Sequence, residues 1–265
     1  MSIKPKKSLG QNFLHDKNII NKIISQEKIN NYNIIEIGPG TGNLTHEIVK
    51  HNPKSLTLIE KDERMCEILN KKLILKKKIR IINKDILSFN LEKILKKNTI
   101  IFGNLPYNIS TQILVKLIKF NQWPPSYRKL IFMFQKEVAE KILAKSNTSK
   151  YGRITIISNW RLKVLNHFNI SRNCFFPKPK VDSTLIVFEP IINKYYKIKD
   201  ISNLEKITQI FFSNKRKMIN KSFKKLFGKS EIHKKKLKTN LTYRPSILKE
   251  EDYFKIAEYY EKNIR

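Results

Sequence analysis

Short apolar runs separated by amphipathic stretches dominate the chain up to Pro190. Such runs are typical of strands buried on both faces of a sheet, and the stretches between them are typical of helices that cover it. We therefore expect an α/β fold with a largely parallel sheet, whose strands occupy residues 34–37, 55–59, 79–82, 99–102, 130–134, 164–170 and 183–188. The apolar residues 154–160 are compatible with either a strand or a helix.

Apolar spacing and capping residues locate the expected helices. Asp16 is expected to cap a helix that runs to about Gln26. Further helices are expected at residues 44–50, 63–75, 110–119 and 136–145. Beyond Pro190 helical spacing replaces the strand pattern, with an amphipathic stretch at 204–227 and a last helix at 251–262. We therefore expect one domain at residues 1–193, which includes an extended basic arm at Lys4–Leu9, and a smaller helical domain at residues 194–265.

Candidate ligand-binding residues follow four successive strands. Gly38-Pro39-Gly40-Thr41-Gly42 comes after the first, Glu60 closes the second, Asp85 follows the third and Asn104 follows the fourth. Parallel strands place their carboxyl ends at one edge of a sheet, where open α/β sheets bind nucleotides. The spacing GxGxG differs from the dinucleotide pattern GxGxxG. Together these strand ends favour a nucleotide site over a set of ordinary solvated loops.

The turn after the fourth strand contains Asn104, Leu105, Pro106 and Tyr107. An Asn side-chain oxygen and a neighbouring carbonyl can accept hydrogen bonds from an exocyclic amine, and a Tyr ring can stack on the base that bears it. Asn and Pro are also common in ordinary turns, so these four residues alone leave both interpretations open. The ligand-bearing strand ends before them favour a site that acts on a base.

The net charge of the chain indicates what kind of partner it binds. Over 265 residues the formal net charge is +32 and the pI is about 10.0, which indicates a polyanionic partner, most simply nucleic acid. The basic residues are mostly Lys, and Ile and Asn are also frequent, so we expect an AT-rich genome to contribute part of the excess.

Composition argues against disulfide-rich, metal-binding, membrane-spanning and secreted proteins. Cys66 and Cys174 are far apart and the His residues show no ligand spacing, so neither a disulfide framework nor a metal site is expected. No apolar run approaches the roughly 18 residues of a membrane span. The basic N-terminus lacks the apolar stretch of a secretory signal, so the cytoplasm is the expected compartment.

Six ordered motifs resemble the ribosomal RNA adenine N6,N6-dimethyltransferases that modify small-subunit rRNA. The resemblance extends from about Lys7 to Phe188, and more thinly into the helical tail. It is carried by Gly10-Gln11-Asn12-Phe13-Leu14, Glu36-Ile37-Gly38-Pro39-Gly40-Thr41-Gly42, Asn104-Leu105-Pro106-Tyr107-Asn108-Ile109-Ser110, Gln135-Lys136-Glu137, Tyr151-Gly152-Arg153, and Phe175 with Pro177-Lys178-Pro179-Lys180-Val181-Asp182-Ser183.

The resemblance implies a Rossmann-like seven-stranded methyltransferase domain that uses S-adenosylmethionine. It implies that two adjacent adenosines in the 3′-terminal hairpin loop of 16S rRNA are each dimethylated. The residues implied to bind the cofactor are Asn12, Leu14, Glu36, Gly38, Gly40, Glu60, Asp85, Ile86 and Asn104, with Glu60 at the ribose and Asp85 at the adenine.

The resemblance also implies the groups that handle the target base. Asn104 and the Leu105 carbonyl hold its amine, Pro106 fixes the turn, Tyr107 stacks on the base and Phe175 covers its other side. The basic residues expected to contact RNA are Lys6, Lys7, Lys178, Lys180, Lys215, Arg216, Lys217 and Lys221. Lys221 departs from the Asn expected there, which leaves the contacts of the tail open.

Alternatives with different functions remain at this stage. A 23S rRNA adenine methyltransferase of the antibiotic-resistance type would use the same turn, commonly with Ile in place of Leu105. A ribosome-assembly factor or mitochondrial transcription factor on the same fold would bind nucleic acid with methyl transfer secondary. A NAD-dependent dehydrogenase is disfavoured by the GxGxG spacing. From the family we expect a monomer that prefers an immature small subunit to naked RNA.

Overall fold

The chain divides into two compact units. In this computed structural model the described residues are 4–73, 78–192, 196–228 and 231–264, with the side chains of Lys7 and Glu231 left aside. One unit comprises Met1–Ala139 and Lys163–Pro190, and the other comprises Glu140–Leu162 and Ile191–Arg265. The expected boundary near residue 193 lies close to Ile191. The assignment of Glu140–Leu162 to the C-terminal unit was not anticipated.

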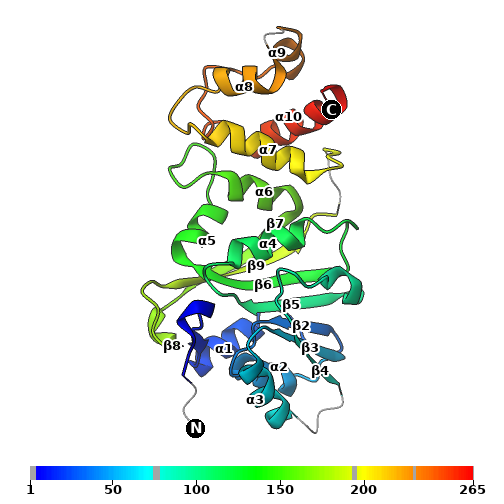
Figure 1. The fold of residues 1–265 in the computed structure, drawn as a ribbon, viewed down its shortest axis with the longest axis vertical. Helices are drawn as coiled ribbons and strands as arrows, with labels where there is room; N and C mark the ends of the chain where they lie inside the picture. The colour runs from blue at the N-terminus through cyan, green and yellow to red at the C-terminus, as the bar shows by residue number, and fades with distance from the viewer. Residues whose placement is uncertain (1–3, 74–77, 193–195, 229–230, 265) are drawn as a thin grey trace. The chain divides into compact units, whose positions relative to one another are not determined.

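A seven-stranded sheet organises the described part of the first unit (Figure 1). The strand order is β4-β3-β2-β5-β6-β9-β7, and the pairs from β4 to β6 are parallel whereas β9 runs antiparallel to β6. Its strands are β2 (Asn33–Ile37), β3 (Ser55–Glu60), β4 (Ile79–Asn83), β5 (Thr99–Asn104), β6 (Tyr127–Gln135), β7 (Leu162–Ile170) and β9 (Ser183–Pro190). Every strand expected from an apolar run is present, and the sheet is the Rossmann-like α/β sheet that was predicted.

Alternate positions of the strands pack on opposite faces of this sheet. Ile34 and Ile100 join one core cluster with residues of the helices α1 and α2, whereas Ile35 and Ile101 are equally buried outside that cluster. Burial on both faces explains why these strands are continuous apolar runs. The helices before the tail are α1 (Lys17–Ile24), α2 (Asn43–Lys50), α3 (Glu63–Leu73), α4 (Ser110–Ile118), α5 (Lys136–Ile142) and α6 (Arg153–Arg161).

Aromatic packing forms the core of the second unit. Its tail helices are α7 (Ile201–Phe212), α8 (Asn220–Phe227), α9 (Glu231–Leu237) and α10 (Glu250–Asn263). Helices α6 and α10 both contact α7. Phe211 and Phe212 of α7 lie against Tyr253 of α10 with ring centroids 5.8 Å apart in each pair, and Phe212 also contacts Tyr151. The segment 154–160, which is compatible with a strand or a helix from its sequence, lies within α6 and is a helix of this unit.

Two local features differ from the sequence-based expectation. The extended basic arm contains a short 3₁₀ turn at Lys7–Leu9 and is followed by a two-residue strand, β1 (Phe13–Leu14), which pairs with β8 (Phe175–Phe176). The amphipathic stretch at 204–227 is interrupted, because α7 ends at Phe212 and α8 begins at Asn220. Asp16 caps α1 as expected, accepting a hydrogen bond from the Ile19 amide at 3.0 Å. No helix in the described ranges has the length and apolarity needed to span a bilayer.

Candidate cofactor and methyl-transfer site

A cavity of about 200 Å³ lies at the carboxyl ends of β2, β3, β4 and β5. Because these strands are neighbours in the sheet, their ends bring together groups that are far apart in the sequence. The lining includes all the residues expected to bind the cofactor: Asn12, Leu14, Glu36, Gly38, Gly40, Glu60, Asp85, Ile86 and Asn104. Leu105, Pro106 and Tyr107 also line it.

At Gly38 and Gly40 the glycine loop lines this cavity with backbone alone, because its conformation there strongly favours glycine. Gly38 and Gly40 have φ of +67° and +54°, values that L residues rarely adopt. A Cβ on Gly40 would lie 2.8 Å from the ring of Phe13, so the loop also accommodates β1. At Gly38 the nearest atom would be the Asn104 carbonyl oxygen at 3.8 Å, which places the loop directly beside the Asn104 turn.

Two buried glutamates lie at the base of the cavity. The Thr45 hydroxyl donates to Glu36 at 2.7 Å, and burial raises the pKa of Glu36 to about 8, so this side chain is mainly protonated at neutral pH. Glu60 accepts hydrogen bonds from the Gly40 amide at 3.1 Å and from the Asp62 amide at 2.9 Å. Burial raises the pKa of Glu60 as well, against the effect of these backbone donors.

The carboxylate of Asp85 is bound by two neighbouring residues of the protein. Its Oδ1 accepts a hydrogen bond from the Leu87 amide at 2.9 Å, and its Oδ2 pairs with Lys61 Nζ at 2.9 Å. Lys61 lowers the pKa of Asp85, so the carboxylate is ionised at neutral pH. A ligand amine at Asp85 would therefore share this carboxylate with Lys61, a partner that the sequence did not indicate.

The Asn104 turn presents an acceptor oxygen beside the cavity. Asn104 Nδ2 donates to the Asn12 carbonyl at 2.8 Å, which fixes the orientation of the amide. Its Oδ1 accepts no hydrogen bond from the described residues. Tyr107 is half-buried, and its hydroxyl lies 2.7 Å from the hydroxyl of Ser183, the first residue of β9. The last residue of the Pro177–Ser183 motif thus holds the Tyr ring of the Asn104 turn.

Phe175 is not among the residues that line the cavity. This side chain is only 2% exposed and packs in the hydrophobic core, where its backbone pairs with Leu14, which does line the cavity. The expected role of Phe175 in covering a bound base stays a prediction. The neighbouring Phe176 is 62% exposed. Strand alternation between β1 and β8 gives the reason, because adjacent residues of a strand point to opposite faces.

The basic residues expected to contact RNA fall into two groups. Lys6 Nζ lies 3.6 Å from Asp62, and Lys215 Nζ donates to the carbonyls of Ser149 and Tyr151, so both hold parts of the protein together. The second group is exposed and comprises Lys178, Lys180, Arg216, Lys217 and Lys221; Lys6 is exposed as well. The side chain of Lys7 lies outside the described residues.

Several contributing residues were missed by sequence reasoning. Gln11 lines the cavity, and Asp62 connects it to the loop after β3. Asp62 stands two positions after Glu60. A second acidic residue at the same strand end is the sequence signal that could have identified it. Thr45 and Ser183 gave none, because their partners lie 9 and 76 positions away.

Comparison with known proteins identifies the family. The family model described as ribosomal RNA adenine dimethylase matches residues 3–262. The chain belongs to the ribosomal RNA adenine dimethylase family. A small-subunit rRNA methyltransferase A of Pelagibacter ubique is 45% identical over 98% of each chain, and the Malacoplasma penetrans protein of that name is 38% identical over 95% of this chain and 90% of its own.

Solved structures agree on the fold of this family member. A dimethyladenosine transferase from Plasmodium falciparum superposes with a TM-score of 0.78 at 27% identity, covering 94% of this chain and 98% of the other. The 23S rRNA methyltransferase ErmE gives a TM-score of 0.67 at 22% identity over 94% and 100% of the two chains, which shows a shared fold.

The cavity fits the family's methyl donor, S-adenosylmethionine. Its sulfonium and ammonium groups are cationic, and this +32 chain nevertheless lines the cavity with the carboxyl groups of Glu36, Glu60 and Asp85. The side-chain-free approach at Gly38 and the Asn104 oxygen suit a nucleoside that must lie close to the backbone. No group of three or more His, Cys, Asp or Glu side chains suited to a metal occurs among the described residues.

Proposed function

We propose that this protein dimethylates N6 of two adjacent adenosines in the 3′-terminal hairpin loop of 16S rRNA during small-subunit biogenesis. The observation that carries the proposal is the 45% identity over 98% of both chains to a small-subunit rRNA methyltransferase A. The candidate site supports it, because the carboxyl groups and the Asn104 turn meet at one cavity. We further propose that the protein acts as a cytoplasmic monomer on immature subunits.

Holding the donor is the first task of this chain in the proposed reaction. Glu60 would hold the ribose, and Asp85 with Ile86 would hold the adenine, while the loop at Gly38 and Gly40 admits the donor close to the backbone. Bound S-adenosylmethionine supplies an electrophilic methyl group. Because the Glu60 carboxylate is fixed by the amides of Gly40 and Asp62, its position is set before binding and little ordering is needed.

Activating the acceptor is the second task. The lone pair of an adenine amine is delocalised into the ring, so the free amine is a poor nucleophile. The Asn104 side-chain oxygen and the Leu105 carbonyl accept its hydrogens, and Pro106 keeps the two acceptors in one rigid turn. These bonds localise the lone pair in the direction of the donor, and the methylated nitrogen then loses one proton to solvent. Positioning and electrostatics therefore accelerate transfer without a dedicated base.

Holding the base outside the RNA stack is the third task. Tyr107 stacks on the extruded adenine, and base–aromatic stacking contributes roughly 1–3 kcal/mol per base. This offsets an unstacking cost of a few kcal/mol, which is smallest in a single-stranded loop. The hydrogen bond to Ser183 supports this role, because it fixes the ring of Tyr107 before the base arrives.

Site-resolved methylation tests the proposal. The purified protein is incubated with labelled S-adenosylmethionine and small subunits that lack these methyl groups, with large subunits in parallel, and the product is mapped by primer extension. We expect dimethyladenosine at the adjacent pair in the 3′ hairpin. Label confined to the large subunit would contradict the proposed substrate, and cofactor binding without label in either subunit would favour an assembly factor.

A further inference from the structure

Asp62 is a buried carboxylate with an unusual number of partners. Its side chain is 1% exposed, yet it forms an ion pair with Arg64 and another with Lys6. Arg64 binds both oxygens, with Nε at 3.0 Å from Oδ1 and the terminal nitrogen at 2.6 Å from Oδ2. This forked geometry is the strong form of the carboxylate–guanidinium contact. It holds the pKa of Asp62 well below its usual range, so the charge is permanent.

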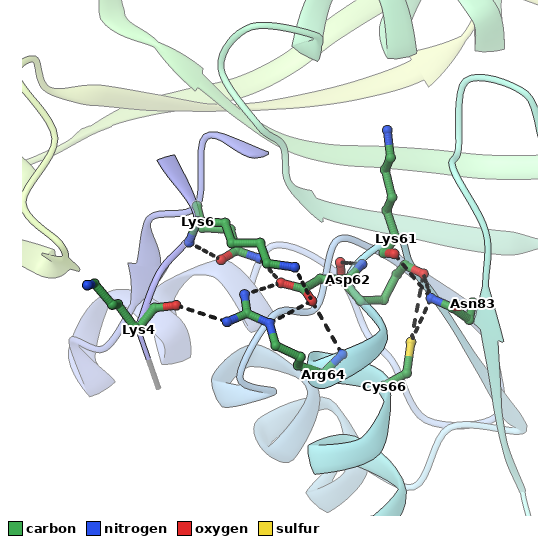
Figure 2. Close-up of polar contacts among 9 residues, drawn as sticks. Lys4, Lys6, Lys61, Asp62, Arg64, Cys66 and Asn83 are labelled. Atoms are coloured by element: carbon green, nitrogen blue, oxygen red, sulfur yellow. Dashed lines mark hydrogen bonds and ion pairs between the residues drawn. The ribbon is translucent and has the colours of Figure 1, made fainter. Parts of the chain in front are cut away.

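The same carboxylate fastens the N-terminal segment, residues 4–14. Gln11 Nε2 donates to Asp62 Oδ2 at 2.9 Å, and Gln11 Oε1 accepts the Lys6 amide at 2.7 Å. Arg64 reaches the segment as well, donating to the Lys4 carbonyl at 3.3 Å. Figure 2 shows the Lys4 carbonyl oxygen beside Arg64 and the Lys6 side chain beside Asp62. The segment is thus tied at three positions to one short stretch after β3.

The same stretch also fixes the side chain of Glu60, the residue expected to bind the ribose. The Asp62 amide donates to Glu60 Oε1, while the Asp62 side chain holds Gln11. Residues 8–14 and Glu60 both line the cavity, whereas Asp62 and Arg64 do not. One residue therefore joins two walls of the cofactor cavity through its backbone and its side chain.

We propose that Asp62, Arg64 and Gln11 form a clamp that positions residues 8–14 as a wall of the cofactor cavity and thereby sets the affinity for S-adenosylmethionine. Asp62 and Arg64 are positioning residues, since they act through the segment that they hold. A preordered wall lowers the ordering cost of binding, whereas a loosened one must be ordered by the ligand. This inference rests on the methyl donor of the family and is independent of which rRNA is the substrate.

Arg64→Ala is the main test, with Arg128→Ala as the matched control. Both arginine side chains are 42% exposed and both pair with a more buried carboxylate, but Arg128 pairs with Glu27 and makes no described contact with residues 4–14. Binding of S-adenosylhomocysteine is measured by calorimetry and amide exchange by mass spectrometry. We expect affinity to fall about tenfold in Arg64→Ala, by loss of preorganisation, and to change little in Arg128→Ala.

Amide exchange supplies the readout that a general loss of stability would not give. The amides of Leu9 and Gln11 both donate to the Lys6 carbonyl, and they should exchange faster in Arg64→Ala while those of the central strands do not. At saturating cofactor, turnover should stay within about threefold of the unmodified protein, since the clamp acts on binding. Arg64→Lys should recover part of the affinity but not the forked contact.

Gln11→Glu provides a second route if Arg64→Ala folds poorly. It leaves the Asp62–Arg64 pair intact and places a second carboxylate against Asp62, so residues 8–14 should again exchange faster. Unchanged exchange and affinity in both variants would refute the clamp. Equal weakening in Arg128→Ala, or a loss of turnover with unchanged affinity, would also refute it.

Discussion

Asn104 combines two contacts that substitutions can separate. Asn104→Ala removes both the acceptor oxygen and the nitrogen that donates to the Asn12 carbonyl, and we expect single-turnover methyl transfer to fall about 10²–10³-fold, the usual loss when a preorganised polar group at a reacting centre is removed. Asn104→Asp keeps an acceptor but replaces the nitrogen that donates to the Asn12 carbonyl, so it should weaken S-adenosylhomocysteine binding as well. Rapid-quench assays with small subunits and calorimetry separate the two effects. Near-normal transfer by Asn104→Ala would contradict the proposed mechanism.

Glu36 should leave a signature in the pH dependence of stability. Its pKa is about 8 in the folded protein against 4.5 in the unfolded chain, so between these values the unfolded chain has lost a proton that the folded protein keeps. Stability therefore falls as pH rises through this window, by about 1.4 kcal/mol per pH unit from this group. Glu36→Gln cannot titrate, so its free energy of unfolding should decline less steeply in urea titrations from pH 5 to pH 8.

Glu47→Gln is the control for that measurement. Glu47 lies on α2, and its pKa is lowered by the hydrogen bond from Lys50, so it is ionised in both states across the same window. Its replacement should leave the slope unchanged. A slope for Glu36→Gln equal to that of the unmodified protein would mean that Glu36 is ionised when folded.

Residue type and position predicted which groups line the cavity at the strand ends but could not predict burial direction. Glu60, Asp85 and Asn104 were singled out because each lies within three residues of the end of an apolar run, and such positions meet at one edge of a parallel sheet. Phe175 and Phe176 are chemically identical, and only the pairing of β8 with β1 decides which one is buried. The clamp at Asp62 was not predictable, because its partner Gln11 lies 51 positions away.

At the scale of elements, the sequence was most informative where local pattern and tertiary role coincide. Strands buried on both faces, such as β5 and β6, have a continuous apolar centre and were located within a few residues. Strands β1 and β8 contain two residues each and exist through a long-range pairing, so no periodicity marks them. The break between α7 and α8 falls in a Lys-rich stretch whose helical spacing continues on both sides.

The segment after α7 supplies a prediction about two neighbouring lysines. Lys215 donates to the carbonyls of Ser149 and Tyr151, whereas Lys217 is exposed. Lys215→Ala should lower the free energy of unfolding by about 1–2 kcal/mol, as expected for hydrogen bonds from a charged donor, and leave the salt dependence of RNA binding unchanged. Lys217→Ala should leave the free energy of unfolding unchanged and reduce the slope of log RNA affinity against log salt by about one.

Urea unfolding and fluorescence anisotropy with a 3′-hairpin RNA measure these two effects. The two variants serve as controls for each other, since each removes one positive charge from the same stretch. If both change the salt slope equally, Lys215 also contacts phosphate and its carbonyl contacts are not retained in the complex.

For the whole molecule, the distribution of charge separates two ligands. The chain carries 54 Lys and Arg against 22 Asp and Glu, yet Glu36, Glu60 and Asp85 line one cavity. Glu36 is mainly neutral, but a cationic methyl donor is attracted to an ionised carboxylate such as that of Asp85, and a polyanionic RNA is attracted to the surface around exposed lysines. The two binding events should therefore respond differently to salt.

RNA binding should weaken steeply with salt, whereas cofactor binding should not. If about 6–10 of the exposed basic side chains contact phosphates, the affinity for small subunits should fall roughly 10³–10⁵-fold between 50 and 200 mM salt, because each contact releases condensed counterions. S-adenosylhomocysteine releases no such counterions, so its affinity should change by less than about threefold over the same range. Filter binding and calorimetry in the same buffers test both expectations. A flat response for the subunits would mean that much of the +32 charge is a solvated surface produced by codon bias. A steep response for both ligands would mean that salt acts on the protein itself.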